Sequence, residues 1–243
     1  MEQHLRNQLP PSALDALQPH FRSAARTLAS TRTNTVSNAW LNKVRTIAPL
    51  PPLLPPALDE QCQRTVYLAL MQDLRLSLHY KKRDAKDVTV YEEVHPLGIV
   101  EKGGLIYLVC TFSDYDDVRT LALHRVKQAH LVHAPVRKPA RFDLDRFIAS
   151  GEFGFKTGAP IVLRATFQRT VGEHLFETLL SLDQRLEVQG DGTLALTATV
   201  PATRSLVFWL TGFGPAVVVH EPQHLRAEMA KIAHEMARVY ADA

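Results

Sequence analysis

The sequence has 243 residues, enough for one large domain or two small ones. Apolar residues make up 46% and charged residues 22% of it, as in ordinary soluble globular proteins, and no apolar run is long enough to cross a bilayer. The residues after Met1 lack the apolar core of a secretory signal, so we expect a cytoplasmic protein. Cys62 and Cys110 are too few for a paired-cysteine zinc site. The net charge of +3 also fits a solvated surface of mixed sign and does not by itself indicate nucleic-acid binding.

Residues 1–58 are predicted to form a helical connector. Apolar residues recur there at helical spacing, at Leu14, Leu17, Phe21, Ala24, Ala25 and Leu28. A second short helix is expected from Trp40 to Ile47, before the prolines from Pro49 to Pro56 end the zone. The zone has too few apolar residues to fold alone, so we expect it to pack on another part of the protein.

Residues 59–140 are predicted to form a small antiparallel β-barrel preceded by a helix. The helix spans 56–73, and segments of alternating hydrophobicity follow at 75–80 and 88–94. Further short strands are expected at 97–100, 105–112, 118–123 and 126–132. Glycines at 103–104 and the acidic segment 113–117 supply hairpin turns. Short strands at close, regular spacing favour a barrel. A linker with a short helix is expected at 141–157.

Residues 158–243 are predicted to form a second domain with the order β-α-β-β-α-β and one further helix. The expected elements are strand 161–167, helix 171–182, strand 185–189, strand 193–200, helix 203–211, strand 216–220 and helix 221–240. This order matches the split βαβ, ferredoxin-like pattern. The fold class expected for the whole chain is therefore α+β.

The stretch from His95 to Cys110, followed by Val118 to Val126, resembles the WYL domain. That family is named for a Trp-Tyr-Leu triplet after a glycine-containing turn, and here the triplet reads Ile106-Tyr107-Leu108, with the Trp replaced. Pro96 matches the family's proline, and the segment from Leu78 to Tyr80 is similar to its first strand. The family's two arginines correspond to Arg119 and Arg125.

The third zone is similar to the WCX-type extension that commonly follows WYL domains. The resemblance rests on the segments Trp209–Gly214 and Val218–Arg226. Residues 3–50 look like the connector that joins a winged helix-turn-helix to the WYL domain in such regulators. The resemblance implies a Sm-like barrel that senses a nucleic acid or nucleotide, and a C-terminal domain that dimerises. No helix-turn-helix precedes the connector in this sequence, which we interpret as a truncation or a headless paralogue.

Arg119 and Arg125 are the first candidates for ligand contact. Residues six apart on an extended strand share a face, and two guanidinium groups side by side repel unless an anion lies between them. Guanidinium forks suit phosphate, and tyrosine rings offer stacking surfaces for bases. The alternative is that each arginine pairs with a nearby carboxylate, such as Asp114, Asp116, Asp117 or Glu101, and only ties loops down.

Five further residues complete the predicted ligand site: Tyr107, His95, Ser77, Tyr80 and Thr120. Each also has a structural interpretation. The tyrosines suit half-buried strand positions. His95 precedes a proline and is held extended, so it either donates to a phosphate or faces solvent from a strand.

Other patterns are weaker. His124, His130 and His133 are candidates for a metal site. On a strand, however, His130 and His133 point to opposite faces, and no cysteine or carboxylate cluster completes a set of four ligands. Neither a metal nor another cofactor is therefore expected. The basic run Lys81-Lys82-Arg83 is either solvated or the rim of a basic surface. No catalytic motif is present, so the sequence does not predict an enzyme.

The sequence thus predicts the sensing and dimerisation part of a bacterial-type transcriptional regulator. Its expected partners are a second copy of the chain and single-stranded DNA, RNA or a nucleotide bound at the barrel. Operator DNA would be contacted only through a helix-turn-helix absent from this chain, and no membrane is involved. The alternatives are a protein-interaction and dimerisation module without a small ligand, or an enzyme acting on nucleotides.

Overall fold

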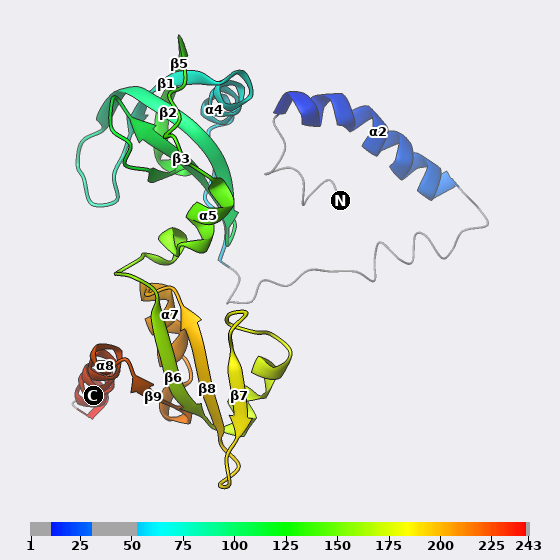
Figure 1. The fold of residues 1–243 in the computed structure, drawn as a ribbon. Coiled ribbons are helices and arrows are strands. Elements are labelled where there is room, and N and C mark those ends of the chain that lie inside the picture. Colours follow the sequence, from blue (N-terminus) through cyan, green and yellow to red (C-terminus); the bar gives the residue numbers. More distant parts are fainter. Residues whose placement is uncertain (1–10, 31–52, 242–243) are drawn as a thin grey trace. The chain divides into compact units, whose positions relative to one another are not determined.

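The computed structural model describes residues 11–30 and 53–241 (Figure 1). The chain divides into two compact units, residues 1–141 and 142–243. Helix α2 (Pro11–Ser30) covers the segment whose apolar spacing predicts the first connector helix. The second connector helix, expected around Trp40, lies outside the described residues.

Between residues 53 and 141 a helix precedes an antiparallel sheet. Its elements are α4 (Glu60–Gln72), β1 (Leu74–Tyr80), β2 (Thr89–Lys102), β3 (Leu105–Phe112), β4 (Arg119–Ala122), the 3₁₀ turn η1 (Leu123–Arg125) and β5 (Val126–Pro135). Helix α4 begins where the Asp59 carboxylate accepts a hydrogen bond from the Cys62 amide at 2.8 Å. It ends at Asp73, whose φ of 51° stops the helix and turns the chain into β1.

The closed barrel predicted for this unit is not formed. The described strands make an open sheet in the order β4-β3-β2-β1-β5, with β4 and β5 at its two edges. These edge strands follow one another in the chain and are joined by the three residues of η1. Because η1 turns as a 3₁₀ helix and does not extend the ladder, the two edge strands do not pair with each other. The expectation of a Sm-like barrel is therefore corrected to an open antiparallel sheet.

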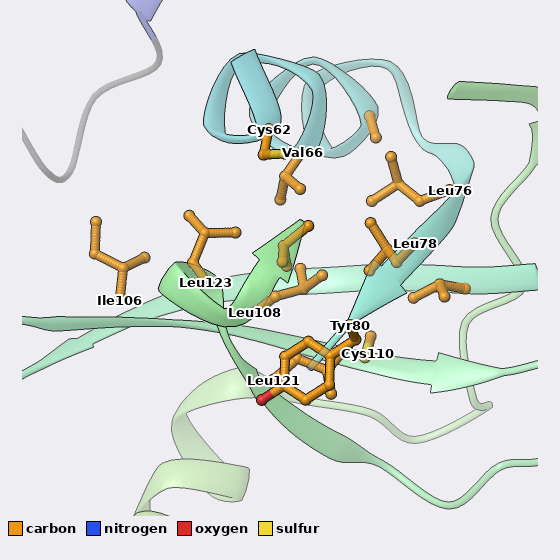
Figure 2. Packing of buried hydrophobic residues seen from close by; sticks show 13 residues of the cluster. Cys62, Val66, Leu76, Leu78, Tyr80, Ile106, Leu108, Cys110, Leu121 and Leu123 are labelled. Atoms are coloured by element: carbon orange, nitrogen blue, oxygen red, sulfur yellow. The ribbon is translucent and has the colours of Figure 1, made fainter. Parts of the chain in front are cut away.

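One side of this sheet and helix α4 enclose the core of the first unit. Along β1 the buried side chains are Leu76, Leu78 and Tyr80, in the alternation that the sequence predicts. Figure 2 shows Cys62 and Val66 of α4 on the same side of the sheet as Leu76 and Leu78. Burial raises the pKa of the Cys62 thiol to about 11, so this cysteine acts as an apolar core residue.

The segments 88–94 and 97–100, predicted as two strands, form the single strand β2. Its register with β3 shifts between Pro96 and Gly98. Proline has no amide proton to give to the ladder and is tolerated at such irregularities. The strand therefore bends at Pro96 without breaking, and His95 stays within it.

The second unit combines a four-stranded sheet with helices, so the α+β class is confirmed. Its elements are α5 (Leu144–Ala149), η2 (Glu152–Gly154), β6 (Ile161–Phe167), α6 (Arg169–Gly172), η3 (Glu173–Phe176), β7 (Arg185–Val188), β8 (Leu194–Val200), α7 (Arg204–Thr211), η4 (Gly214–Ala216), β9 (Val217–Glu221) and α8 (Gln223–Ala241). The sheet is antiparallel in the order β7-β8-β6-β9 (Figure 1). Phe167, fully buried, packs against Trp209 and Phe213 at ring-centroid distances of 5.9 and 5.5 Å.

The helix predicted over 171–182 is much shorter than expected. Only α6 and the 3₁₀ turn η3 form, and together they end at Phe176. The Gln184 side chain accepts a hydrogen bond from the Leu180 amide and donates one to the Leu175 carbonyl, at 2.8 and 2.7 Å. These bonds satisfy backbone groups that a longer helix would have paired internally.

Helix α8 carries the apolar seam predicted for the last helix, but only its first part is covered. Leu225 is buried, and Met229 and Ile232 pack partly against the core of the unit. Met236 and Val239 are 48% and 62% exposed. The apolar seam thus packs against the core over the first turns of α8 and is exposed to solvent over the last turns.

Candidate anion-binding site

A basic pocket of about 260 Å³ lies where the loop between β1 and β2 meets η1 and the start of β5. The residues that line it are five cationic side chains and one histidine: Lys81, Lys82, Arg83, His124, Arg125 and Lys127. They come from two stretches that are far apart in the sequence, 81–83 and 124–127.

The pairing of β1 with β5 brings these segments together. The two strands are antiparallel, and Tyr80 at the end of β1 lies opposite Val126 at the start of β5. Just beyond this pair, the Lys81 amide donates a hydrogen bond to the Arg125 carbonyl at 3.0 Å. The basic run after β1 is therefore held against the basic end of η1.

The pocket concentrates positive charge that no described residue compensates by an ion pair. No Asp or Glu in the described part of the chain lines it, and no ion pair found among those residues involves any of its five cations. Lys82 also lies 6.0 Å from the centre of the Tyr91 ring. Cations gathered in this way repel one another, so an anion that enters the pocket relieves that repulsion.

His124 adds a polar atom that the protein leaves unsatisfied. Its Nδ1 is buried and has no hydrogen-bond partner among the described residues. Burial, and then the charges of Arg125 and Lys127, lower the pKa of His124 below its ordinary value of 6.5. The ring is therefore neutral at neutral pH, and a nearby anion would favour its protonation.

The two arginines expected to share a cleft are placed differently from one another. Arg125 lines the basic pocket, whereas Arg119 does not and forms an ion pair with Asp117. Both partners of that pair are more than 60% exposed. The predicted geometry assumed one extended strand, but η1 interrupts the strand alternation between the two arginines. For Arg119 the structure shows the carboxylate pairing that was the alternative interpretation.

The predicted tyrosines and hydroxyl groups are dispersed over the sheet. Tyr80 is 6% exposed, and its hydroxyl accepts a hydrogen bond from the Ala122 amide at 3.2 Å. Tyr107 is half-buried on β3, opposite Ala122. The Ser77 hydroxyl donates to Glu92 at 3.3 Å, and Thr120 is exposed on β4. None of these four lines the basic pocket, so the ligand roles predicted for them stay predictions.

His95 is neither solvent-facing nor open to a ligand in this structure. Its side chain is 1% exposed, and both ring nitrogens are engaged within the protein. It would have to be uncovered before it could donate to a phosphate.

Sequence reasoning missed Lys127 and His124 as candidate ligand residues and treated Lys81-Lys82-Arg83 only as a solvated run or a basic rim. The available signal was the presence of basic residues at the adjoining ends of two predicted strands, 75–80 and 126–132. Pairing these two predicted strands side by side would have placed the basic residues at their ends in one cluster.

Comparison with known families matches both units. The WYL domain model matches residues 62–131, and the WCX domain model matches residues 159–237. The chain carries a WYL domain followed by a WCX domain. The resemblances seen around Tyr107 and Trp209 are thereby confirmed, and the basic pocket belongs to the WYL domain.

The WYL–WCX chain is 23% identical over 170 residues to the uncharacterized HTH-type transcriptional regulator YobV of Bacillus subtilis (strain 168). The match covers 69% of this chain and 53% of YobV, so the chain spans about half the length of that curated relative.

Two solved structures show a looser likeness. Proteasome accessory factor B/C of Arthrobacter aurescens matches with a TM-score of 0.32 and 18% identity, over 72% of this chain and 27% of that one. A CRISPR Cas-related protein matches with a TM-score of 0.42 and 13% identity, over 75% of this chain and 52% of that one. At these TM-scores the likenesses carry no weight for fold or function.

Two further points concern membrane-spanning helices and metal sites in the described residues, 11–30 and 53–241. No helix there is both long and apolar enough to span a membrane. No group of three or more His, Cys, Asp or Glu residues is arranged there to hold a metal ion.

Proposed function

We propose that this chain is the ligand-sensing part of a transcriptional regulator, and that its WYL domain binds an anionic effector in the basic pocket around Arg125. A short single-stranded oligonucleotide or a nucleotide has the required chemistry. The observation that carries this proposal is the convergence of five cations on a pocket that no carboxylate lines. The proposed role is binding, not catalysis.

The second part of the proposal concerns signal output. The WCX domain would hold two copies of the chain together, and the effector would favour one arrangement of a helix-turn-helix that lies outside this chain. An effector shifts such an equilibrium only by the difference between its affinities for the two arrangements. The apolar hollow of about 610 Å³ beside α8, lined among others by Val219, Ile232 and Met236, supports a role in assembly. A chain that sediments as a monomer at all concentrations would contradict the dimer.

Replacing Arg125 by alanine should weaken the binding of a short single-stranded DNA at least about tenfold, or about 1.4 kcal/mol. The guanidinium would make charge-assisted hydrogen bonds to phosphate that alanine cannot replace. Fluorescence anisotropy with a labelled oligonucleotide at low salt measures the affinity.

Two single variants provide the matched controls for this measurement. Lys86→Ala removes an exposed cation from the same loop but outside the pocket lining, and Arg119→Ala removes the arginine that pairs with Asp117. Both should change the affinity by less than about threefold, as expected for exposed charges that do not line the pocket. If all three variants bind like wild type, or if wild type does not bind at low salt, the oligonucleotide proposal is wrong.

Binding should also tighten as the pH falls from about 8 to about 6, because His124 takes up a proton in the complex. In the free protein the lowered pKa keeps His124 neutral, whereas a bound phosphate raises that pKa. Each unit of this increase contributes up to about tenfold in affinity at the acid end of the range. A His124→Gln variant should show a flat pH profile, and the same slope in both proteins would exclude His124 from the site.

A further inference from the structure

His95 connects three segments of the WYL-domain unit. It lies on β2 directly opposite Thr111 of β3. Its Nε2 is 3.0 Å from the carbonyl oxygen of Ser113, in the turn after β3. Its Nδ1 accepts a hydrogen bond from the backbone N–H of Arg137 at 3.0 Å, in the segment that follows β5 and leads toward the second unit.

These partners fix the protonation state of the ring. A carbonyl oxygen can only accept a hydrogen bond and a backbone N–H can only donate one, so Nε2 must carry the proton and Nδ1 must be bare. The ring is therefore the neutral Nε2–H tautomer. The imidazolium ion has a proton on both nitrogens and would set Nδ1–H against the N–H of Arg137.

The same junction is held by further bonds to the segment 136–138. The Arg137 guanidinium donates to Asp116 at 2.8 Å and to the Ser113 carbonyl at 3.4 Å. The Val136 amide donates to the Asp73 carbonyl at 2.9 Å, and the Lys138 ammonium lies 2.7 Å from the Asp73 carboxylate. Of these contacts, the one made by His95 is the only bond whose acceptor atom is lost when a single proton binds.

We propose that His95 is a proton-operated latch, which ties the backbone N–H of Arg137 to the turn after β3 when it is neutral and releases that N–H when it is protonated. The latch bond lies within the first unit, on the segment that follows β5. It does not depend on what the basic pocket binds, so it goes beyond the function proposed above.

The charges around the ring oppose its protonation. Arg75 from β1 and Arg137 from the outgoing segment disfavour the imidazolium, whereas the hydrogen bond to the Ser113 carbonyl and the charge of Asp114 favour it. Glu93 is already paired with Arg75. Burial is the largest cause that lowers the pKa of His95 below 6.5. The latch bond is thus fully present above pH 6.5 and is lost as the pH falls through the lowered pKa.

The test uses the full chain and two substitutions with opposite expectations. His95→Asn places an amide oxygen near the position of Nδ1, so it can accept the Arg137 N–H but cannot titrate. His95→Leu removes both the acceptor and the titration. The quantity measured is the protection of the Arg137 amide against hydrogen exchange, by NMR, after correction for the intrinsic exchange rate at each pH.

In wild type we expect this protection to fall as the pH is lowered from about 7.5 through the lowered pKa of His95, at the pH where the ring itself titrates. In His95→Asn it should stay constant over the same range, and in His95→Leu it should be low throughout. Ring ¹⁵N spectra of wild type should show the Nε2–H tautomer at neutral pH. Constant protection in wild type, an equal fall in the Asn variant, or an Nδ1–H tautomer would each overturn the latch. If the Leu variant does not fold, the comparison of wild type with Asn still decides.

Discussion

Raising the salt concentration from about 50 to about 200 mM should weaken the binding of single-stranded DNA by the WYL domain about 100-fold. Each phosphate neutralised on a single strand contributes about −0.7 to the slope of log affinity against log salt concentration. Contacts from all five pocket cations therefore predict a slope of about −3.5. Anisotropy titrations over a series of salt concentrations give this slope directly.

A triple variant identifies where the slope originates. Replacing Lys81, Lys82 and Arg83 by alanine should reduce its magnitude by about 2, because three phosphate contacts are lost. Lys86→Ala, in the same loop but outside the pocket lining, should leave the slope unchanged. A triple variant with the wild-type slope would mean that the phosphates contact another surface, even if the oligonucleotide binds.

Phe167→Ala should lower the free energy of unfolding of the WCX unit by about 3–5 kcal/mol. The ring is fully buried at the end of β6, against Trp209 and Phe213, and alanine would leave a cavity that rigid neighbours on a sheet and a helix fill poorly. Urea unfolding followed by Trp209 fluorescence, in a Trp40→Phe background, measures the change, since the chain has two tryptophans.

The matched control lies on the same strand. Val162 is 49% exposed on the opposite side of β6, so Val162→Ala should cost no more than about 0.5 kcal/mol. Equal effects at the two positions would show that β6 does not bury one face as described here.

Most elements of the fold could be predicted because their patterns are local. Alternating apolar residues predicted β1, and this strand buries the expected face. The ends of helices and the closure of the sheet were harder to predict. In place of the helix predicted over 171–182 two short turns form, and the Gln184 side chain bonds to backbone groups at Leu175 and Leu180. The barrel was wrong because strand count does not determine whether the last strands pair, and here η1 turns the chain away from the ladder.

The candidate site was predicted only in part. Arg125 was identified through the family motif, and it lines the basic pocket. Arg119 was grouped with it on strand periodicity, which η1 interrupts. His95 was considered as a ligand residue, but its partners Ser113 and Arg137 lie 18 and 42 residues away in the sequence. No local pattern connects residues at such separations.

The amino-acid sequence by itself determined the two-domain organisation as a WYL domain and a WCX domain, since motif residues and apolar periodicity are properties of neighbouring positions. Only the tertiary structure decided which cations converge. The pairing of β1 with β5 brings Lys81 against Arg125 and places Lys127 at the same pocket. Strand alternation indicates the face on which a side chain lies, but the neighbouring strand is chosen by the packing of the whole sheet.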